Sequence, residues 1–197
     1  MDIRKKSKKQ TIFTIGHSTR ALDELVDLLR GHGVRRVIDI RTIPRSRRNP
    51  QYNRETLGPA LRSRKIGYVH LKGLGGLRHA KPNSKNLGWH NASFRGFADY
   101  MQTPGFEAAL RRAIKLSKDK PSALMCAEAV PWRCHRSLVA DSLAARKFSV
   151  DHIISVARAN RHRLTSFARV RGRKVTYPSD KPLRRKPPVR KSKQLSK

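Results

Sequence analysis

Five short apolar segments recur along the chain, and helical stretches or loops separate them. The segments cover residues 11–15, 36–40, 66–71, 122–126 and 150–154. Each is five or six residues long and mostly apolar, which is typical of buried strands, and residues 11–15 are also rich in β-branched side chains. Between them, apolar residues recur at helical spacing in 22–29, 53–64, 93–101, 105–116 and 137–146. This alternation predicts an α/β fold: a Rossmann-like three-layer arrangement in which a mostly parallel sheet of about five strands is flanked by helices.

The length of the chain favours one domain. Its 197 residues suffice for one sizeable core and are too few for two ordinary domains. We expect a single compact domain over residues 11–178, with a short edge strand near residues 173–178. The basic segments 1–10 and 179–197 are predicted to be disordered tails, because they contain too few apolar residues to form a core.

The predicted topology brings reactive side chains to one edge of the sheet. Ligands of open parallel sheets bind outside the carboxyl ends of the strands. His70 lies at one of these ends. The candidate site residues at these ends are His17, Ser18, Arg20, Asp39, Arg41, Arg45, Gly75, Gly76, Cys126, Glu128, Cys134, His135 and Arg136. We therefore expect the functional site at this edge.

Both cysteines lie where a buried strand, a loop and a helix start follow one another. Amides at a helix N-terminus and nearby cations favour thiolates and bound anions. Cys126 or Cys134 is thus a candidate nucleophile or redox centre, and Glu128 or His135 is a candidate for proton transfer. We expect Cys134 in the first helical turn, with a reactive thiol. The alternative is that both cysteines are inert, buried residues.

Several of the remaining residues suit an anion. Ser18 and Arg20 follow a strand and could hold an anion together with backbone amides, although Ser18 or Thr19 could equally cap the next helix. The guanidinium groups of Arg41, Arg45 and Arg136 match phosphate geometry. A second group of candidates comprises His17, Asp39, Gly75 and Gly76; the two glycines allow a close approach of a ligand or of another strand, or form a tight turn.

The charge of the chain is extreme, at +33 for 46 Lys and Arg against 13 Asp and Glu. Such a chain attracts polyanions and binds nucleic acid through phosphate contacts. We expect nucleic acid, a nucleotide or another polyanion as a partner, with a solvated basic face as the alternative. No apolar run approaches the length of a membrane span, so no membrane partner is expected.

Other familiar sites do not fit the spacing. A structural zinc site needs four ligands, whereas Cys126, Cys134 and His135 supply three, and a fourth (His17 or His70) would come from elsewhere. We therefore expect no metal and no cofactor. A phosphatase-type cysteine loop places five residues between Cys and Arg, whereas six separate Cys126 from Arg133. A Walker loop, a GxGxxG fingerprint and a serine hydrolase elbow are absent from the sequence.

The cysteine content favours a reducing compartment. The chain has two cysteines, and no signal-peptide apolar stretch follows its basic N-terminus. We expect a cytoplasmic location.

Several separate motifs, in order, resemble the family known as DUF488, a bacterial and archaeal domain of unknown function. They occupy residues 14–20 (TIGHSTR), 37–41 (VIDIR), 68–76 (YVHLKGLGG), 125–128 (MCAE) and 134–136 (CHR), with a later likeness over 162–178. The resemblance covers roughly residues 11–178. It implies a compact α/β domain and supplies no reaction. Ile40 stands where the family often has Val.

Three functional hypotheses follow from these observations. The first is an enzyme that acts on a phosphate-bearing substrate, a nucleotide or nucleic acid, at the Cys/Glu/His/Arg site. The second is a non-catalytic nucleic-acid-binding accessory protein, whose binding would persist after both cysteines are replaced. The third is a small metal-binding domain, which elemental analysis would identify.

Overall fold

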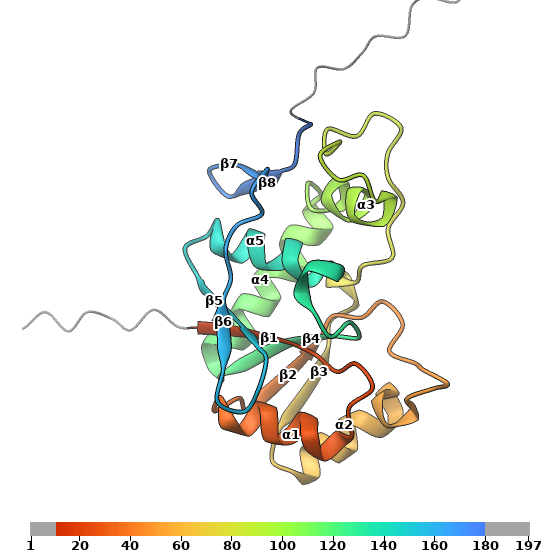
Figure 1. Cartoon of the computed structure of the whole chain (residues 1–197), viewed down its shortest axis with the longest axis vertical. Coiled ribbons are helices and arrows are strands. Elements are labelled where there is room, and N and C mark those ends of the chain that lie inside the picture. The colour runs from red at the N-terminus through yellow and green to blue at the C-terminus, as the bar shows by residue number, and fades with distance from the viewer. Residues whose placement is uncertain (1–10, 180–197) are drawn as a thin grey trace, which may run out of the picture.

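The computed structural model describes residues 11–179, and its centre is a six-stranded sheet (Figure 1). The strand order is β3-β2-β4-β1-β5-β6, and the first five strands are parallel. The strands are β1 Thr11–Gly16, β2 Arg36–Asp39, β3 Gly67–His70, β4 Ser122–Cys126, β5 Ser149–Ile153 and β6 Ala159–Arg161. The predicted α/β fold with a mostly parallel sheet is confirmed.

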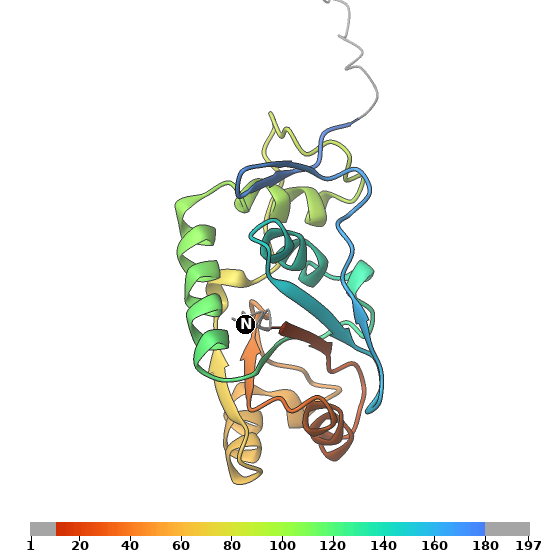
Figure 2. The same ribbon diagram turned by 90° about the vertical axis from the view of Figure 1, so that its left-hand side faces the viewer.

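Five α-helices cover the two faces of the sheet and form the outer layers. They are α1 Leu22–Gly31, α2 Arg54–Ser63, α3 Ala92–Tyr100, α4 Pro104–Asp119 and α5 Arg136–Ala144. Helices α1 and α2 pack on one face, and α4 and α5 pack on the other, with α3 beyond them (Figure 2). The part of the chain that the structure describes contains no helix with both the length and the apolar character needed to cross a membrane.

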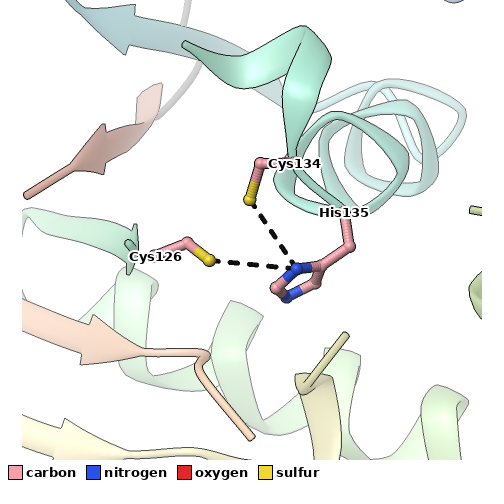
Figure 3. A group of neighbouring side chains, drawn as sticks. All are labelled: Cys126, Cys134 and His135. Carbon is pink, nitrogen blue, oxygen red and sulfur yellow. Dashed lines mark hydrogen bonds between the residues drawn. The ribbon is translucent and has the colours of Figure 1, made fainter. Parts of the chain in front are cut away.

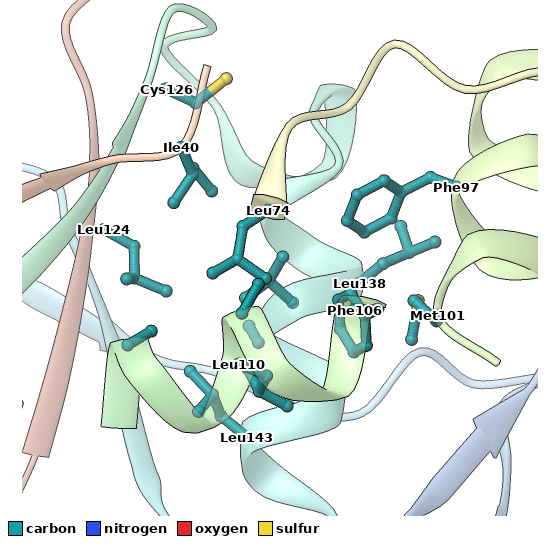
Figure 4. Packing of buried hydrophobic residues seen from close by; sticks show 14 of the residues in the cluster. Ile40, Leu74, Phe97, Met101, Phe106, Leu110, Leu124, Cys126, Leu138 and Leu143 are labelled. Atoms are coloured by element: carbon teal, nitrogen blue, oxygen red, sulfur yellow. The ribbon is translucent and has the colours of Figure 1, made fainter. Parts of the chain in front are cut away.

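The strand alternation explains the two hydrophobic cores. Along β4, Ala123 and Met125 face α1 and α2, whereas Leu124 and Cys126 belong to the cluster that includes residues of α4 and α5. Figure 4 shows Cys126 at the border of this second cluster, with its sulfur pointing away from the packed leucines. The last residue of β4 is thus anchored by packing while its thiol reaches the carboxyl edge.

The sheet order places three chain segments side by side at that edge. β4 lies between β1 and β2, with Cys126 in register with Gly16 and with Met125 in register with Asp39. The residues that follow these strands are therefore neighbours in space. Those after β2 and those after β4 are nevertheless more than 80 positions apart along the chain.

Two local expectations are wrong. Helix α1 begins at Leu22 with Ala21 at the N-cap and no side-chain cap, so neither Ser18 nor Thr19 caps it. The segment near residues 173–178 does not extend the main sheet, because β8 (Lys174–Thr176) pairs with β7 (Arg169–Arg171) in a separate hairpin. The antiparallel strand β6 forms the sheet edge instead. The predicted tails, apart from Ser179, lie outside the described residues.

A buried polar network attaches the C-terminal segment to the core. Asp141 on α5 is fully buried and accepts hydrogen bonds from Thr165, from the hydroxyl of Tyr177 (2.7 Å) and from His162 Nε2 (2.9 Å). His162 Nδ1 lies 3.0 Å from His152 Nε2 on β5. Burial lowers the pKa of His152 to about 3, so this ring is neutral at physiological pH.

Candidate functional site

A cluster of two thiols and one imidazole forms at the carboxyl end of β4. Cys126 ends the strand, a loop with a 3₁₀ turn at Pro131–Arg133 follows, and Cys134 and His135 immediately precede α5. The Nδ1 atom of His135 lies 3.9 Å from Cys126 Sγ and 3.7 Å from Cys134 Sγ (Figure 3). His135 Nε2 lies 3.2 Å from the carbonyl oxygen of Ile40. Because a carbonyl only accepts, Nε2 carries a proton, and Nδ1 is the ring atom that faces both sulfurs.

The two thiols have opposite protonation preferences. Hydrogen bonds from Cys134 and His135, with the positive charges of His135 and Arg136, lower the pKa of Cys126 well below its ordinary value. The same hydrogen bond to Cys126, together with burial, raises the pKa of Cys134 well above its ordinary value. The expected position of Cys134 in the first helical turn is wrong, because it lies before the helix, next to the N-cap residue His135. Its raised pKa favours a neutral thiol, and the reactivity of this thiol stays a prediction.

Arg136 holds the loop that follows β4. Its side chain is 1% exposed and donates hydrogen bonds to the carbonyl oxygens of Glu128 (3.1 Å) and Ala129 (3.2 Å). Its backbone N–H donates to Cys134 Sγ at 3.4 Å. The loop packs so closely that a Cβ at Gly16 would lie 1.7 Å from the carbonyl oxygen of Glu128. Glycine is thus required at this position for β1 and the loop to meet.

A second buried group supports the β2 side of the site. The carboxylate of Asp39, which is fully buried, accepts hydrogen bonds from Arg41 Nη2 (2.6 Å) and from the hydroxyl of Tyr68 (2.7 Å). Arg41 also donates to the carbonyl of Tyr52 (2.7 Å) and from Nη1 to His17 Nε2 (3.2 Å). Burial lowers the pKa of His17, so the ring is neutral and its Nδ1–H donates to the carbonyl of Ser18.

Two adjoining pockets open over these groups and together form what we call the cleft. The first, of about 410 Å³, is lined by the largely buried Cys126, Cys134 and His135 and also by Glu128 and Arg133. The second, of about 370 Å³, is lined by His17, Ser18, Thr19, Arg41, Ile43, Arg45, Ser46, Asn49, Ala127, Glu128 and Ala129. Arg41, Ile43, Ala127 and Glu128 belong to both pockets. Glu128 is exposed at their junction, and its carboxylate makes no hydrogen bond within residues 11–179.

Nine of the thirteen predicted site residues line the cleft. They are His17, Ser18, Arg41, Arg45, Gly76, Cys126, Glu128, Cys134 and His135. The other four, Arg20, Asp39, Gly75 and Arg136, line neither pocket.

Those four residues have internal contacts instead. Arg20 donates hydrogen bonds to Glu24 (2.9 Å) and to the carbonyl of Gly16 (2.6 Å). Gly75 lies against Thr42, where a Cβ would come within 2.4 Å of the hydroxyl oxygen. Asp39 and Arg136 are engaged as described above. These contacts give all four a role in building the walls of the site.

Sequence reasoning missed several lining residues. Arg133 stands one position too far from Cys126 for a phosphatase loop and has no other signal in the sequence, yet it lines the first pocket. Ile43 and Leu77, which are 63% and 67% exposed, and Phe94 also line this pocket. The charged loop that contains Ile43 follows a predicted strand, and this position could have indicated that Ile43 lies at the site. Nothing in the sequence pattern indicates that the start of α3 brings Phe94 to this edge.

The cluster supplies three potential metal ligands. The ligand atoms of Cys126, Cys134 and His135 all lie within 4.8 Å of one another. The two histidines considered as a fourth ligand are engaged elsewhere, because His17 Nε2 faces Arg41 and His70 Nε2 donates to the carbonyl of Arg41 at 2.8 Å. The arrangement therefore offers either a thiolate nucleophile or a three-ligand metal site.

Comparison with known proteins gives one finding. No curated protein and no solved structure matches the chain. The family model described as "Domain of unknown function DUF488" matches residues 21–143, which span α1 to α5 and include Asp39, Arg41, Cys126, Glu128 and the Cys134–His135–Arg136 triplet. The match covers more than half of the chain and confirms the family resemblance seen in the motifs. The chain belongs to the DUF488 family.

Proposed function

We propose that the protein is an enzyme that acts on a phosphate-bearing substrate, a nucleotide or nucleic acid, bound in the cleft. One observation carries this proposal: the two thiols and the imidazole line a pocket that also holds Glu128 and Arg133, whose side chains make no hydrogen bond or ion pair within residues 11–179. Buried, perturbed groups that face a pocket are typical of catalytic sites.

Two arginines suit the role of holding the phosphate. The side chains of Arg45 and Arg133 line the cleft, and neither makes a hydrogen bond or ion pair within the described residues 11–179. Arg20, Arg41 and Arg136, which were also candidates, have protein acceptors already. Arg133 lines the first pocket and Arg45 the second, and Glu128 lines both, so a phosphate group bound by either arginine would share its pocket with Glu128.

The acid–base and apolar parts of the site are also present. Glu128 borders both pockets and is exposed, so its carboxylate is free to exchange a proton with a bound substrate or water. Ile43, Leu77 and Phe94 provide an apolar wall in the pocket that holds the cluster. A base or another flat apolar part of a nucleotide would pack on this wall.

Binding and turnover test this proposal separately. We expect nucleoside monophosphates or short oligonucleotides to bind to the wild-type protein in calorimetric titrations. The double variant Arg45→Gln/Arg133→Gln should weaken binding by more than tenfold, since each charge-assisted hydrogen bond contributes about 1.5 kcal/mol or more. The matched control is Arg111→Gln/Arg112→Gln, which removes the same charge from the exposed face of α4.

Product analysis by chromatography supplies the second readout. Glu128→Gln should retain binding and lose turnover. If no phosphate compound binds, or if the control pair weakens binding as much as the cleft pair, the proposal fails.

A non-catalytic nucleic-acid-binding role is the second candidate, and the net charge of +33 favours it. It differs from the enzyme in one respect that is simple to measure. Nucleic-acid binding that rests on surface charge alone should be the same in a Cys126→Ser/Cys134→Ser variant, which would lack turnover.

A further inference from the structure

We infer that Cys126, Cys134 and His135 bind one divalent metal ion of the zinc type, with a coordination position open to the cleft. The metal site rests on the geometry of the cluster alone. Only its role in chemistry rests on the proposed function, for which it would supply the reactive centre.

The donor set and its spacing match tetrahedral zinc. With Zn–S bonds of about 2.3 Å and Zn–N bonds of about 2.0 Å, neighbouring ligand atoms lie about 3.6 Å apart. His135 Nδ1 lies 3.7 Å and 3.9 Å from the two sulfurs. Both distances are within a few tenths of an ångström of this value, and all three ligand atoms lie within 4.8 Å of one another. Two thiolates with one imidazole favour zinc over magnesium or calcium, which prefer oxygen ligands.

The surrounding structure fixes the ligands in the binding orientation. The hydrogen bond from His135 Nε2 to the carbonyl of Ile40 turns Nδ1 toward the sulfurs, as supporting hydrogen bonds do around metal-bound histidines. The backbone N–H of Arg136 donates to Cys134 Sγ. Gly76 leaves the space that the imidazole ring occupies, since a Cβ there would lie 2.4 Å from Nδ1.

The number of ligands points to an open site. Structural zinc sites have four protein ligands, whereas catalytic zinc sites have three and keep one position for water or substrate. Within residues 11–179, no other His, Cys, Asp or Glu joins the cluster. All three ligand residues line the first pocket, so the fourth position faces the space next to Glu128 and Arg133. A metal ion there would polarise a phosphate oxygen or activate a water molecule.

Elemental analysis and cobalt substitution test the inference. The full-length protein, reduced and reconstituted with zinc and then dialysed, should retain one zinc ion per chain. Reconstitution with cobalt(II) should give the intense thiolate-to-metal absorption of tetrahedral cysteine coordination. Cys126→Ser, Cys134→Ser and His135→Asn should each lose zinc retention, while His90→Asn, which changes an exposed histidine outside the cluster, should not.

Two results would overturn the inference. The first is that the reduced wild-type protein retains no zinc and gives no cobalt–thiolate absorption band. This result would count against the metal site even if the two cysteines form a disulfide on oxidation. The second is zinc retention that is unchanged in the three ligand variants, which would place the metal elsewhere. If a ligand variant fails to fold by circular dichroism, the cobalt spectrum of the wild type still decides.

The outcome is independent of the test of the proposed function. If the protein binds zinc but has no affinity for phosphate compounds, the metal site is supported and the proposed substrate is refuted. Phosphate binding through Arg45 and Arg133 in a protein that holds no metal would refute only the metal site.

Discussion

The backbone of Gly76 lies directly against the imidazole ring of His135, so that a methyl group at position 76 would fall 2.4 Å from Nδ1 and 2.7 Å from Cγ. Gly76→Ala should therefore displace the ring without removing any ligand. We expect the zinc affinity to fall by about 10- to 100-fold, the usual effect of disturbing groups that orient a metal ligand. Competition with a zinc indicator measures it.

Gly105→Ala is the control for this variant. The nearest atom to a Cβ at position 105 lies 3.6 Å away, which is an ordinary contact, so zinc affinity should not change. An unchanged affinity in Gly76→Ala would show that the position of the His135 ring does not matter for metal binding.

Gly16→Ala should destabilise the whole domain. The added methyl group would lie 1.7 Å from the carbonyl oxygen of Glu128 and 2.8 Å from Arg136 Nη1, so the loop held by Arg136 must move. We expect the free energy of unfolding to fall by about 2–4 kcal/mol in urea denaturation. Gly105→Ala should change it by less than about 1 kcal/mol. Equal stabilities for the two variants would contradict the close packing of β1 against this loop.

The buried His152 makes stability depend on acid pH. Its pKa is about 3 in the folded protein and 6.5 in the unfolded chain, so the unfolded chain binds the additional proton between these values. Stability is then fully present above pH 6.5 and falls as the pH decreases toward 3. The groups around the ring are Thr14, His162, Asp141 and Arg136.

Variants at position 152 isolate this effect. Between pH 6 and pH 4 the contribution of His152 amounts to about 2 kcal/mol. His152→Gln should remove that part of the pH slope in denaturation curves, whatever its effect on stability at neutral pH. His90→Gln, at an exposed position, should retain the slope. Parallel slopes for the wild type and His152→Gln would show that another group causes the pH dependence.

Removal of residues 179–197 should weaken nucleic-acid binding without abolishing it. This segment contains eight of the 46 Lys and Arg residues, so most of the positive charge remains on the rest of the chain. The slope of log binding constant against log salt concentration should become shallower, because fewer counterions are released. Loss of all binding at low salt would place the interaction in the segment alone.

The general architecture could be predicted because it depends on local patterns and on topology. Short apolar runs that alternate with amphipathic stretches identify the strands, and the parallel order of a sheet brings their carboxyl ends to one edge. This reasoning placed Cys126 next to His17 and Arg41 without any contact being known. Strand β6 was missed because Ala159–Arg161 has no apolar run, and it forms only by pairing with β5.

The roles of individual side chains could not be predicted in the same way. Whether Cys126 or Cys134 is the thiolate depends on which sulfur accepts hydrogen bonds in three dimensions. The sequence suggests Arg136 as a phosphate ligand. In the structure its guanidinium donates to the carbonyl oxygens of Glu128 and Ala129 instead, and these contacts form only because the loop folds back onto the helix start. Such contacts are specified by the tertiary structure and not by residue spacing.

The location of a bound phosphate compound tests the central claim most directly. Backbone amide chemical shifts of the isotope-labelled, full-length protein can be followed by NMR during titration with adenosine monophosphate. We predict that the shifted amides cluster around residues 17–19, 42–46, 76–77 and 127–135, which border the cleft. Saturable shifts confined to the opposite edge of the sheet or to the terminal segments, or no shifts at all, would contradict the assignment of the cleft as the functional site.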